Sequence, residues 1–361
     1  GLGDVYKRQA PEPAPETDAT AESAAVPESE AQEAAERRVE ADAAPAPEPV
    51  PPPPPAPAPQ PAPPPATVRR TVSAEVARQL AAAGCRYCFT VPAEPILPLL
   101  DDLDAAGIRV VTTRHEGGAA FMAEALSQSI GRPQIVAVSR AVGAANAAVG
   151  IHTAHQDSAP LVALVGQVET SFRGRESFQE TDLAGGLGSL ATWAAQIDSA
   201  DQAPVVLGKA WRRLNTGRPG PVLLSVPLDI QSQEVEVLDE PAPKPPGARG
   251  PAADRSAVSR AMKMLAASER GVIVAGAGVL RARATKRLVA LSEALAVPVI
   301  AAWRRPDVFP NDHVNYLGMA GSWSAHTVHQ RLADADVICF IGTRLSEITT
   351  DGYRIPGPEQ R

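Results

Sequence analysis

A glutamate followed by four small residues is the first feature of the sequence that could do chemistry. Glu116 stands in TTRHEGGAAFMAEALSQ (112–128), directly before two glycines and two alanines. A carboxylate in the first turn of a helix is favoured by the helix macrodipole, and an isolated one is usually a solvated surface group. The small neighbours are unusual in that setting, because they let a backbone, a second subunit or a flat ligand approach closely. The pattern therefore indicates a carboxylate that faces either water or a closely held ligand.

Two further polar stretches follow predicted strands. The stretch SRAVGAANAAVG (139–150) contains Gly143 and Asn146 and joins the end of a strand to the start of a helix. Parallel sheets bind ligands at this position, although an ordinary turn there would have similar residues. The polar loop GRESFQETD (174–182) follows another strand, and its Phe178 and Gln179 fit a ligand contact and a plain surface position equally well. Neither stretch decides a function by itself.

Alternating helices and strands must position these residues. Ser73 is predicted to cap a helix through VARQLAAA that stops at Gly84, and the strand YCFTV follows. The alternation continues with the strand IRVVT, a helix from Glu116 to Ile130 ended by Gly131, the strand QIVAVS, the helix AANAAVGIHTAHQ and the strands LVALVGQ and VLLSVP. Strands separated by helices in this way form right-handed crossovers in a parallel sheet. Because the strands are apolar throughout, helices should cover both faces of the sheet.

A second series of the same kind follows a stretch rich in proline and glycine, EPAPKPPGARGPAAD. It contains the strands GVIVAGAG, PVIAA and VICFIG with helices between them, and it leaves little room for a last strand before Arg361. We therefore predict an α/β protein with two doubly wound parallel-sheet domains. Their predicted ranges are 67–235 and 254–361, the second one short of a complete sheet, with a linker at 236–253.

Residues 1–66 differ in composition from the rest of the chain. Residues 10–66 are mostly Ala, Pro and Glu, so burial cannot offset the entropy of ordering them, and we predict a disordered tail. This stretch has eleven acidic residues against two arginines, a net charge of −9, while the whole chain has −7, so the remainder sums to +2. A nucleic-acid-binding surface needs a clustered excess of Lys and Arg. Nucleic acid is therefore not an expected partner.

The composition also bears on the cellular compartment. No apolar run is long enough to span a membrane, and the N-terminus lacks the residue order of a secretory signal. Three cysteines, Cys85, Cys88 and Cys339, cannot form a disulfide framework. Cys85 and Cys88 form a CxxC without a second pair for zinc, so two packed thiols are expected. We predict a cytoplasmic protein with no membrane partner.

Several motifs in this order resemble one enzyme family. RHEGGAAFMAEA, SRAVGAANAAVGIHTAHQDSAPLVALVGQV, GRESFQETD and TGRPGPVLLSVP resemble the pyrimidine-binding domain of thiamine diphosphate enzymes of the acetolactate synthase type. The match covers residues 67–235. The stretches VIVAGAGVLRA and WRRPDVFPNDHVNYLGMAG resemble the central domain of the same family. Jointly, these motifs are far more specific than any one of them.

The resemblance implies roles for four residues. The family's glutamate that matches Glu116 bonds the aminopyrimidine ring of thiamine diphosphate and promotes proton transfer at the cofactor. The positions of Gly143 and Asn146 match the loop beside that ring, and Gln179 matches a residue near the reaction centre. The resemblance also implies a small 2-oxo acid substrate, carboligation or decarboxylation of that acid, and a homo-oligomer with its active site at a subunit interface.

The sequence departs from the family's pattern at several positions. Ala141 and Val142 replace the first two residues of the usual Gly-Pro-Gly, Ala93 and Glu94 replace glycines after the first strand's proline, and Leu228 replaces a common lysine. The family's Gly-Asp-Gly motif and following asparagine, which hold Mg²⁺, have no counterpart. The resemblance therefore predicts no metal ligand in this chain, with Mg²⁺ bound outside it, and an inactive fragment of a larger enzyme.

Two alternative functions stay open. The turn GAGVLR (276–281) lies between a strand and a helix like a dinucleotide fingerprint but lacks its third glycine. FAD binding, or an oxidoreductase that binds FAD or NAD, is therefore an open alternative, as is a non-catalytic protein that keeps the fold. His326 and His329 lie one helical turn apart without a third ligand, so surface positions are expected for both.

Overall fold

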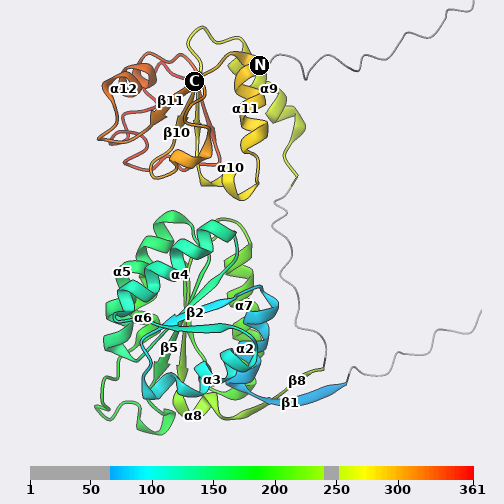
Figure 1. Cartoon of the computed structure of the whole chain (residues 1–361), viewed down its shortest axis with the longest axis vertical. Coiled ribbons are helices and arrows are strands. Elements are labelled where there is room, and N and C mark those ends of the chain that lie inside the picture. Colours follow the sequence, from blue (N-terminus) through cyan, green and yellow to red (C-terminus); the bar gives the residue numbers. More distant parts are fainter. Residues whose placement is uncertain (1–65, 240–251) are drawn as a thin grey trace, which may run out of the picture. The chain divides into compact units, whose positions relative to one another are not determined.

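The computed structural model describes residues 66–239 and 252–361 (Figure 1). Nearly all of the predicted tail, 1–66, and most of the predicted linker, 236–253, lie outside the described residues. Residues 66–239 contain a six-stranded sheet and residues 252–361 a four-stranded one. No helix in the described ranges has both the length and the apolar character needed to cross a membrane.

The larger sheet has the strand order β3-β2-β4-β5-β7-β6, and every neighbouring pair is parallel. Its strands are β2 (Tyr87–Thr90), β3 (Arg109–Thr112), β4 (Gln134–Val138), β5 (Leu161–Gln167), β6 (Trp193–Gln196) and β7 (Val222–Pro227). The direction of winding reverses at β2, because β3 is added on one side of it and β4 on the other. In doubly wound sheets, ligands bind in the crevice at such a switch point.

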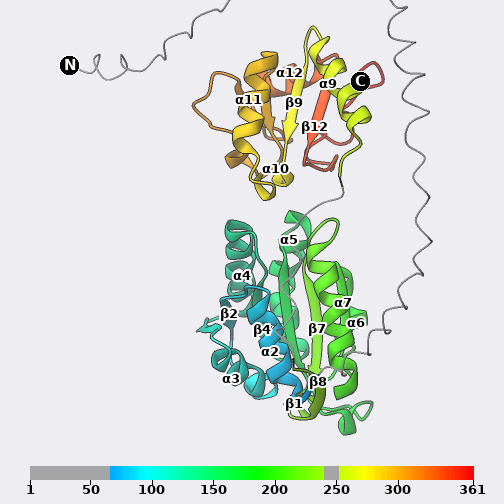
Figure 2. The same ribbon diagram turned by 90° about the vertical axis from the view of Figure 1, so that its right-hand side faces the viewer.

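Helices cover both faces of this sheet (Figure 2). One face carries α2 (Val72–Ala82), α3 (Leu97–Ala105) and α7 (Ala203–Asn215), and the other carries α4 (Glu116–Ile130), α5 (Ala141–Asp157) and α6 (Leu183–Leu187). The predicted α/β class with parallel sheets is confirmed.

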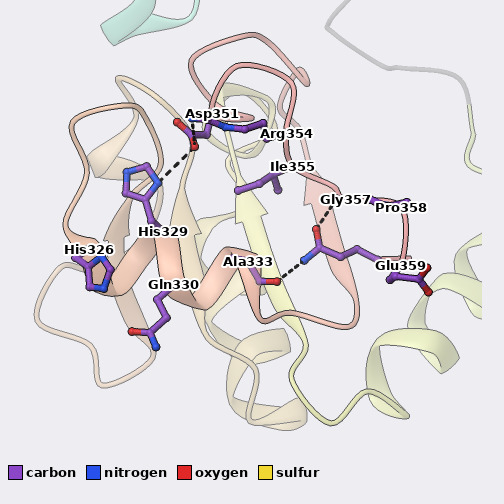
Figure 3. A pocket seen from close by; sticks show the side chains of 11 residues that line it. His326, His329, Gln330, Ala333, Asp351, Arg354, Ile355, Gly357, Pro358 and Glu359 are labelled. Carbon is purple, nitrogen blue, oxygen red and sulfur yellow. Dashed lines mark hydrogen bonds and ion pairs between the residues drawn. The ribbon is translucent and has the colours of Figure 1, made fainter.

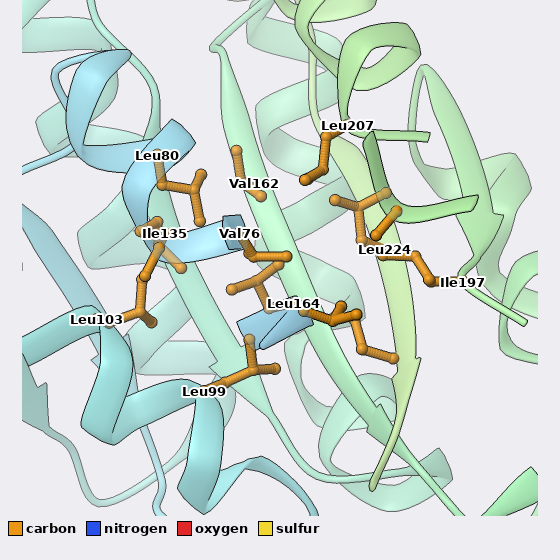
Figure 4. Close-up of a cluster of buried hydrophobic side chains, with 14 of the residues drawn as sticks. Val76, Leu80, Leu99, Leu103, Ile135, Val162, Leu164, Ile197, Leu207 and Leu224 are labelled. Carbon is orange, nitrogen blue, oxygen red and sulfur yellow. The ribbon is translucent and has the colours of Figure 1, made fainter. Parts of the chain in front are cut away.

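Alternate residues of each central strand supply the two cores. Val162 and Leu164 of β5 join the cluster under α2, α3 and α7, which Figure 4 shows, while Ala163 and Val165 join the cluster under α4 and α5. Successive side chains of a strand point to opposite faces, so a strand that is covered on both sides must be apolar at every position. Burial of this kind contributes about 25 cal/mol per Å² of apolar surface removed from water.

A separate antiparallel pair joins the two ends of the first described range. Strand β1 (Thr67–Thr71) pairs with β8 (Glu234–Leu238), with Thr67 opposite Leu238. This pair was not predicted from the sequence, and the predicted domain boundary at 235 falls inside β8. The pair also shows that the predicted cap of the first helix is wrong.

The first helix is capped by Thr71 instead of Ser73. Residues up to Thr71 are extended because they pair with β8, so α2 begins at Val72 and the Thr71 side chain accepts a hydrogen bond from the Ala74 N–H at 3.2 Å. Ser73 is buried inside the first turn and donates to the carbonyl of Gln231 at 2.9 Å. Its hydroxyl ties α2 to the chain just before β8.

The smaller sheet has four parallel strands in the order β11-β10-β9-β12. They are β9 (Val272–Ala275), β10 (Val299–Ala301), β11 (Tyr316–Met319) and β12 (Ile338–Ile341), and the helices are α9 (Arg255–Ala266), α10 (Ala277–Arg281), α11 (Thr285–Leu295) and α12 (His326–Ala333). Two apolar clusters again use alternate residues, with Ile273 in one and Val274 in the other. Strand β11 was not predicted, because its sequence, YLGM, is short and contains a glycine.

The cysteines allow a test of the first core. Cys85 and Cys88 are buried in the cluster under α2 and α3, and burial raises the pKa of both thiols, that of Cys88 to about 12. Because the thiolate is the reactive form, we expect neither thiol to react with Ellman's reagent at pH 8 in the native protein. Cys339 is only partly buried and should react slowly. In urea, all three thiols should react, and rapid native labelling of a Cys339→Ser variant would contradict this packing.

Candidate functional site

The start of α4 places Glu116 at the switch point of the larger sheet. Strand β3 ends at Thr112, and α4 begins at Glu116 after a short polar connection. His115 caps the helix, because its Nδ1 accepts a hydrogen bond from the Gly117 N–H at 3.0 Å. The helix backbone is thereby fixed at its first turn, and the Glu116 side chain is left half-buried.

Asn146, on α5, holds one oxygen of the Glu116 carboxylate. Its Nδ2 donates to Glu116 Oε2 at 3.0 Å. The other oxygen, Oε1, has no hydrogen-bond partner within the described ranges. A Cβ atom added to Gly143 would lie 3.5 Å from this Oε1 and 3.3 Å from Val138 Cβ, so the glycine leaves space beside the carboxylate. The structure thus brings three sequence-predicted residues, Glu116, Gly143 and Asn146, together around one open carboxylate oxygen.

A contact between small residues sets the separation of α4 and α5. A Cβ atom added to Gly150 would lie 2.5 Å from the Cβ of Ala120 and 3.0 Å from its carbonyl carbon. Gly150 is one helical turn beyond Asn146, and Ala120 is one turn beyond Glu116. The two helices therefore touch backbone to backbone next to the polar pair. This close approach brings the Asn146 amide within reach of the Glu116 carboxylate.

Gln179, the fourth predicted residue, contacts the start of α5 through its backbone. Its carbonyl accepts a hydrogen bond from the Ala141 N–H, at the start of α5, at 3.4 Å. It has a left-handed backbone with φ 61°. Glu180 ties the loop together by accepting from the N–H groups of Gly174 and Ser177 at 2.7 and 3.3 Å, and these bonds lower its pKa. The Gln179 side chain makes no hydrogen bond to any described residue, so its predicted role near a reaction centre stays a prediction.

Two family models match these ranges. One, described as the N-terminal thiamine pyrophosphate (TPP) binding domain of thiamine pyrophosphate enzymes, matches residues 70–185, which include the four predicted site residues. The other, the central domain of the same enzymes, matches residues 258–360. The chain belongs to the thiamine pyrophosphate enzyme family. The family predicted from the sequence motifs is confirmed.

Acetolactate synthase large subunits are among the relatives of this thiamine pyrophosphate enzyme chain. The probable acetolactate synthase large subunit of Methanocaldococcus jannaschii is 32% identical, over 79% of this chain and 49% of its own length. The acetolactate synthase isozyme 3 large subunit of Escherichia coli K12 is 33% identical, over 76% and 49%. The acetolactate synthase large subunit of Corynebacterium glutamicum is 29% identical, over 82% and 48%. The chain spans about half the length of these curated relatives.

A charged pair joins two loops beside this site. Arg140 Nη2 donates to Glu94 Oε2 at 2.7 Å, joining the segment after β4 to the segment after β2. Glu94 replaces a glycine of the family's pattern, but no role was predicted from the sequence for either residue. The pair could have been suspected from the sequence, because opposite charges occur in two loops that follow the neighbouring parallel strands β2 and β4.

The glycines of the GAGVLR turn are explained by packing within the smaller sheet. The Gly278 N–H donates to the carbonyl of Gly342 at 2.8 Å, and a Cβ atom on Gly278 would lie 2.6 Å from Gly342 Cα. A Cβ atom on Gly276 would lie 2.6 Å from the Cβ of Thr343. Both glycines therefore permit the turn to touch the segment after β12. Neither needs a nucleotide phosphate to explain it.

The predicted surface histidines lie on α12, beside an open depression of about 640 Å³ (Figure 3). His326 is exposed, whereas His329 is half-buried and forms a hydrogen bond between its Nε2 and Ser324 Oγ at 3.0 Å. Its Nδ1 lies 3.9 Å from Asp351, whose carboxylate pairs with Arg354. Within the ranges that the structure describes, no three His, Cys, Asp or Glu side chains are grouped as metal ligands would be.

Proposed function

We propose that this chain forms the pyrimidine side of a thiamine diphosphate-dependent enzyme that joins or decarboxylates 2-oxo acids, as acetolactate synthases do. The observation that carries the proposal is the Glu116 carboxylate, which Asn146 holds at Oε2 while Oε1 stays open beside Gly143. An aminopyrimidine ring needs a flat space and a carboxylate oxygen at its edge, and these residues fit that need. The acetolactate synthase names of the relatives supply the reaction class.

Each residue has a distinct task in this proposal. When bound, thiamine diphosphate supplies a nucleophilic carbon for reaction at the carbonyl group of the substrate. Glu116 Oε1 accepts and returns a proton at the ring nitrogen that faces it. Asn146 fixes the direction of the carboxylate through its bond to Oε2. Gly143 keeps the space for the ring, because a side chain there would approach Oε1.

The remaining details of the proposal extend beyond these residues. Mg²⁺ and the diphosphate would be held by residues outside this chain, so the chain by itself would be inactive. A homo-oligomer with the active site at a subunit interface and a cytoplasmic location are further predictions, and FAD in the central domain stays an open alternative. Carboligation is favoured over simple decarboxylation, in line with the synthase names of the relatives, and the enzyme would be a transferase or a lyase.

Binding of an isolated aminopyrimidine tests the proposal directly. We expect 4-amino-5-hydroxymethyl-2-methylpyrimidine to bind the chain, and Asn146→Ala to weaken that binding by about ten-fold, because a hydrogen bond to a charged group contributes about 1.5 to 3 kcal/mol. Isothermal titration calorimetry measures both constants. Asn215→Ala, which removes an amide on α7, is the matched control and should change nothing. Binding of FAD or NAD without any aminopyrimidine binding would favour the oxidoreductase alternative. Aminopyrimidine binding without pyruvate turnover by the whole protein would favour the non-catalytic one.

A further inference from the structure

We infer that Arg140 binds the carboxylate of the 2-oxo acid substrate, and that Glu94 competes with the substrate for this arginine. The inference rests on the proposed function, since it takes the edge of the sheet at Glu116 as the place of reaction. It adds a positioning residue that the resemblance did not assign. It also gives a role to the two charges that meet between the loops after β2 and β4, of which Glu94 replaces a glycine of the family's pattern.

Arg140 is anchored beside the proposed cofactor site. It directly precedes α5 and follows Ser139, whose Cβ would lie 3.4 Å from a Cβ atom on Gly143, the glycine that faces Glu116. The next residue, Ala141, bonds to the Gln179 carbonyl. Its two neighbours in the chain therefore place Arg140 between the proposed cofactor space and the loop that carries Gln179.

The guanidinium group has unused hydrogen-bond capacity. The Arg140 side chain is only 14% exposed, yet its sole hydrogen bond among the described residues runs from Nη2 to Glu94 Oε2. Its Nε is buried and has no partner in the described part of the chain. A guanidinium carries five N–H donors in a planar fork and prefers two parallel bonds to a carboxylate. Arg140 is therefore placed as an incompletely satisfied carboxylate receptor.

Glu94 has the properties of a displaceable partner. Its backbone begins the short helix η1 (Glu94–Ile96), where Pro95 and Ile96 are buried, but its side chain is 61% exposed. Ion pairs with an exposed partner contribute little to stability, because water competes for the charges. A substrate carboxylate can take the place of Glu94 on Arg140 at small cost. A carbonyl compound without a carboxylate has no such partner, so the pair discriminates in favour of 2-oxo acids.

Pyruvate and butane-2,3-dione provide matched probes, because the dione replaces the carboxylate of pyruvate with a neutral acetyl group. Saturation-transfer NMR on the methyl groups, at constant ionic strength, gives the affinity of the chain for each. We expect pyruvate to bind and the dione to bind at least about ten-fold more weakly. Arg140→Gln should weaken the binding of pyruvate by about ten-fold or more, and Arg140→Lys should weaken it by less. Glu94→Gln should increase the affinity for pyruvate by about three-fold, since it removes the competing anion.

The controls separate this inference from general charge effects and from the proposed function. Arg69→Gln and Glu234→Gln break an exposed Arg–Glu pair between β1 and β8 and should leave pyruvate binding unchanged. The inference is overturned if pyruvate fails to bind, if Arg140→Gln leaves its affinity unchanged in a variant with normal melting, or if Glu94→Gln weakens it. Aminopyrimidine binding by the same variants should be preserved. If the unmodified chain does not bind the aminopyrimidine, the proposed function is overturned. If it binds the aminopyrimidine but its affinity for pyruvate does not depend on Arg140, only this inference is overturned.

Discussion

Replacing Glu116 with glutamine is expected to slow proton exchange at the thiazolium carbon of the cofactor by about 10²-fold or more in the whole protein. Glutamine keeps the size of the side chain and can still bond to Asn146, but it cannot accept and return a proton. In the family that the sequence resembles, cofactor affinity comes mainly from the diphosphate and its metal, so most of the affinity should remain. NMR of the cofactor in deuterated buffer follows the exchange directly.

A variant that removes a different helix-start carboxylate provides the control. Asp201 lies in the first turn of η4 (Ala200–Gln202) and is exposed, so Asp201→Asn removes the same charge without touching the site. It should leave the exchange rate as it was. If Glu116→Gln also leaves the rate unchanged, Glu116 is only a helix-start residue, and the role assigned to it is wrong.

Gly150→Ala is expected to destabilise the fold by about 2 kcal/mol, although alanine is the better helix former by about 1 kcal/mol. The added methyl group would overlap the Ala120 side chain at 2.5 Å and press on the backbone of Ala120 and Phe121. The helices α4 and α5 must then separate. Because Glu116 and Asn146 lie one turn away, aminopyrimidine binding should weaken along with the free energy of unfolding. Urea denaturation and calorimetry measure the two effects.

Gly208→Ala tests whether the loss comes from the helix contact. Gly208 lies inside α7, and a Cβ atom there would meet no atom within 4 Å. We expect this substitution to stabilise the protein by about 0.5 to 1 kcal/mol, since it removes only the intrinsic cost of glycine in a helix. Equal effects of the two substitutions would show that α4 and α5 do not depend on the close approach at Gly150.

Local sequence signals were sufficient to predict the elements that carry Glu116 and Asn146. The helix from Glu116 to Ile130 was predicted with both ends correct, because the small apolar residues recur with helical spacing and Gly131 supplies the left-handed residue, φ 66°, that ends it. The strands β4 and β5 were equally clear, since apolar runs between polar turns indicate buried parallel strands. The roles of the site residues came from the resemblance, and the structure adds only their proximity.

Contacts between distant segments could not be predicted in this way. The ladder of β1 and β8 joins residues such as Thr67 and Glu236, which are 169 positions apart. Strand β8, EVEVL, alternates Glu and Val as a half-buried strand does, but the sequence of β1, TVRRT, lacks this alternation and gives no local sign that the two strands pair. The ion pair of Arg140 and Glu94 spans 46 positions. Each residue alone resembles a solvated loop charge. Only the parallel pairing of β2 with β4 brings the two loops to one edge.

The ladder of β1 and β8 also determines how the first described range would respond to mechanical load. Its antiparallel register places Thr67 opposite Leu238 and Thr71 opposite Glu234, so the chain enters and leaves at the same end of the ladder. Tension applied through these two points would act on one rung at a time, in an unzipping geometry, instead of shearing all rungs together. The ladder would peel open at low force while the six-stranded sheet behind it stays folded. The proposed cofactor site would thus be shielded from strain transmitted along the polypeptide.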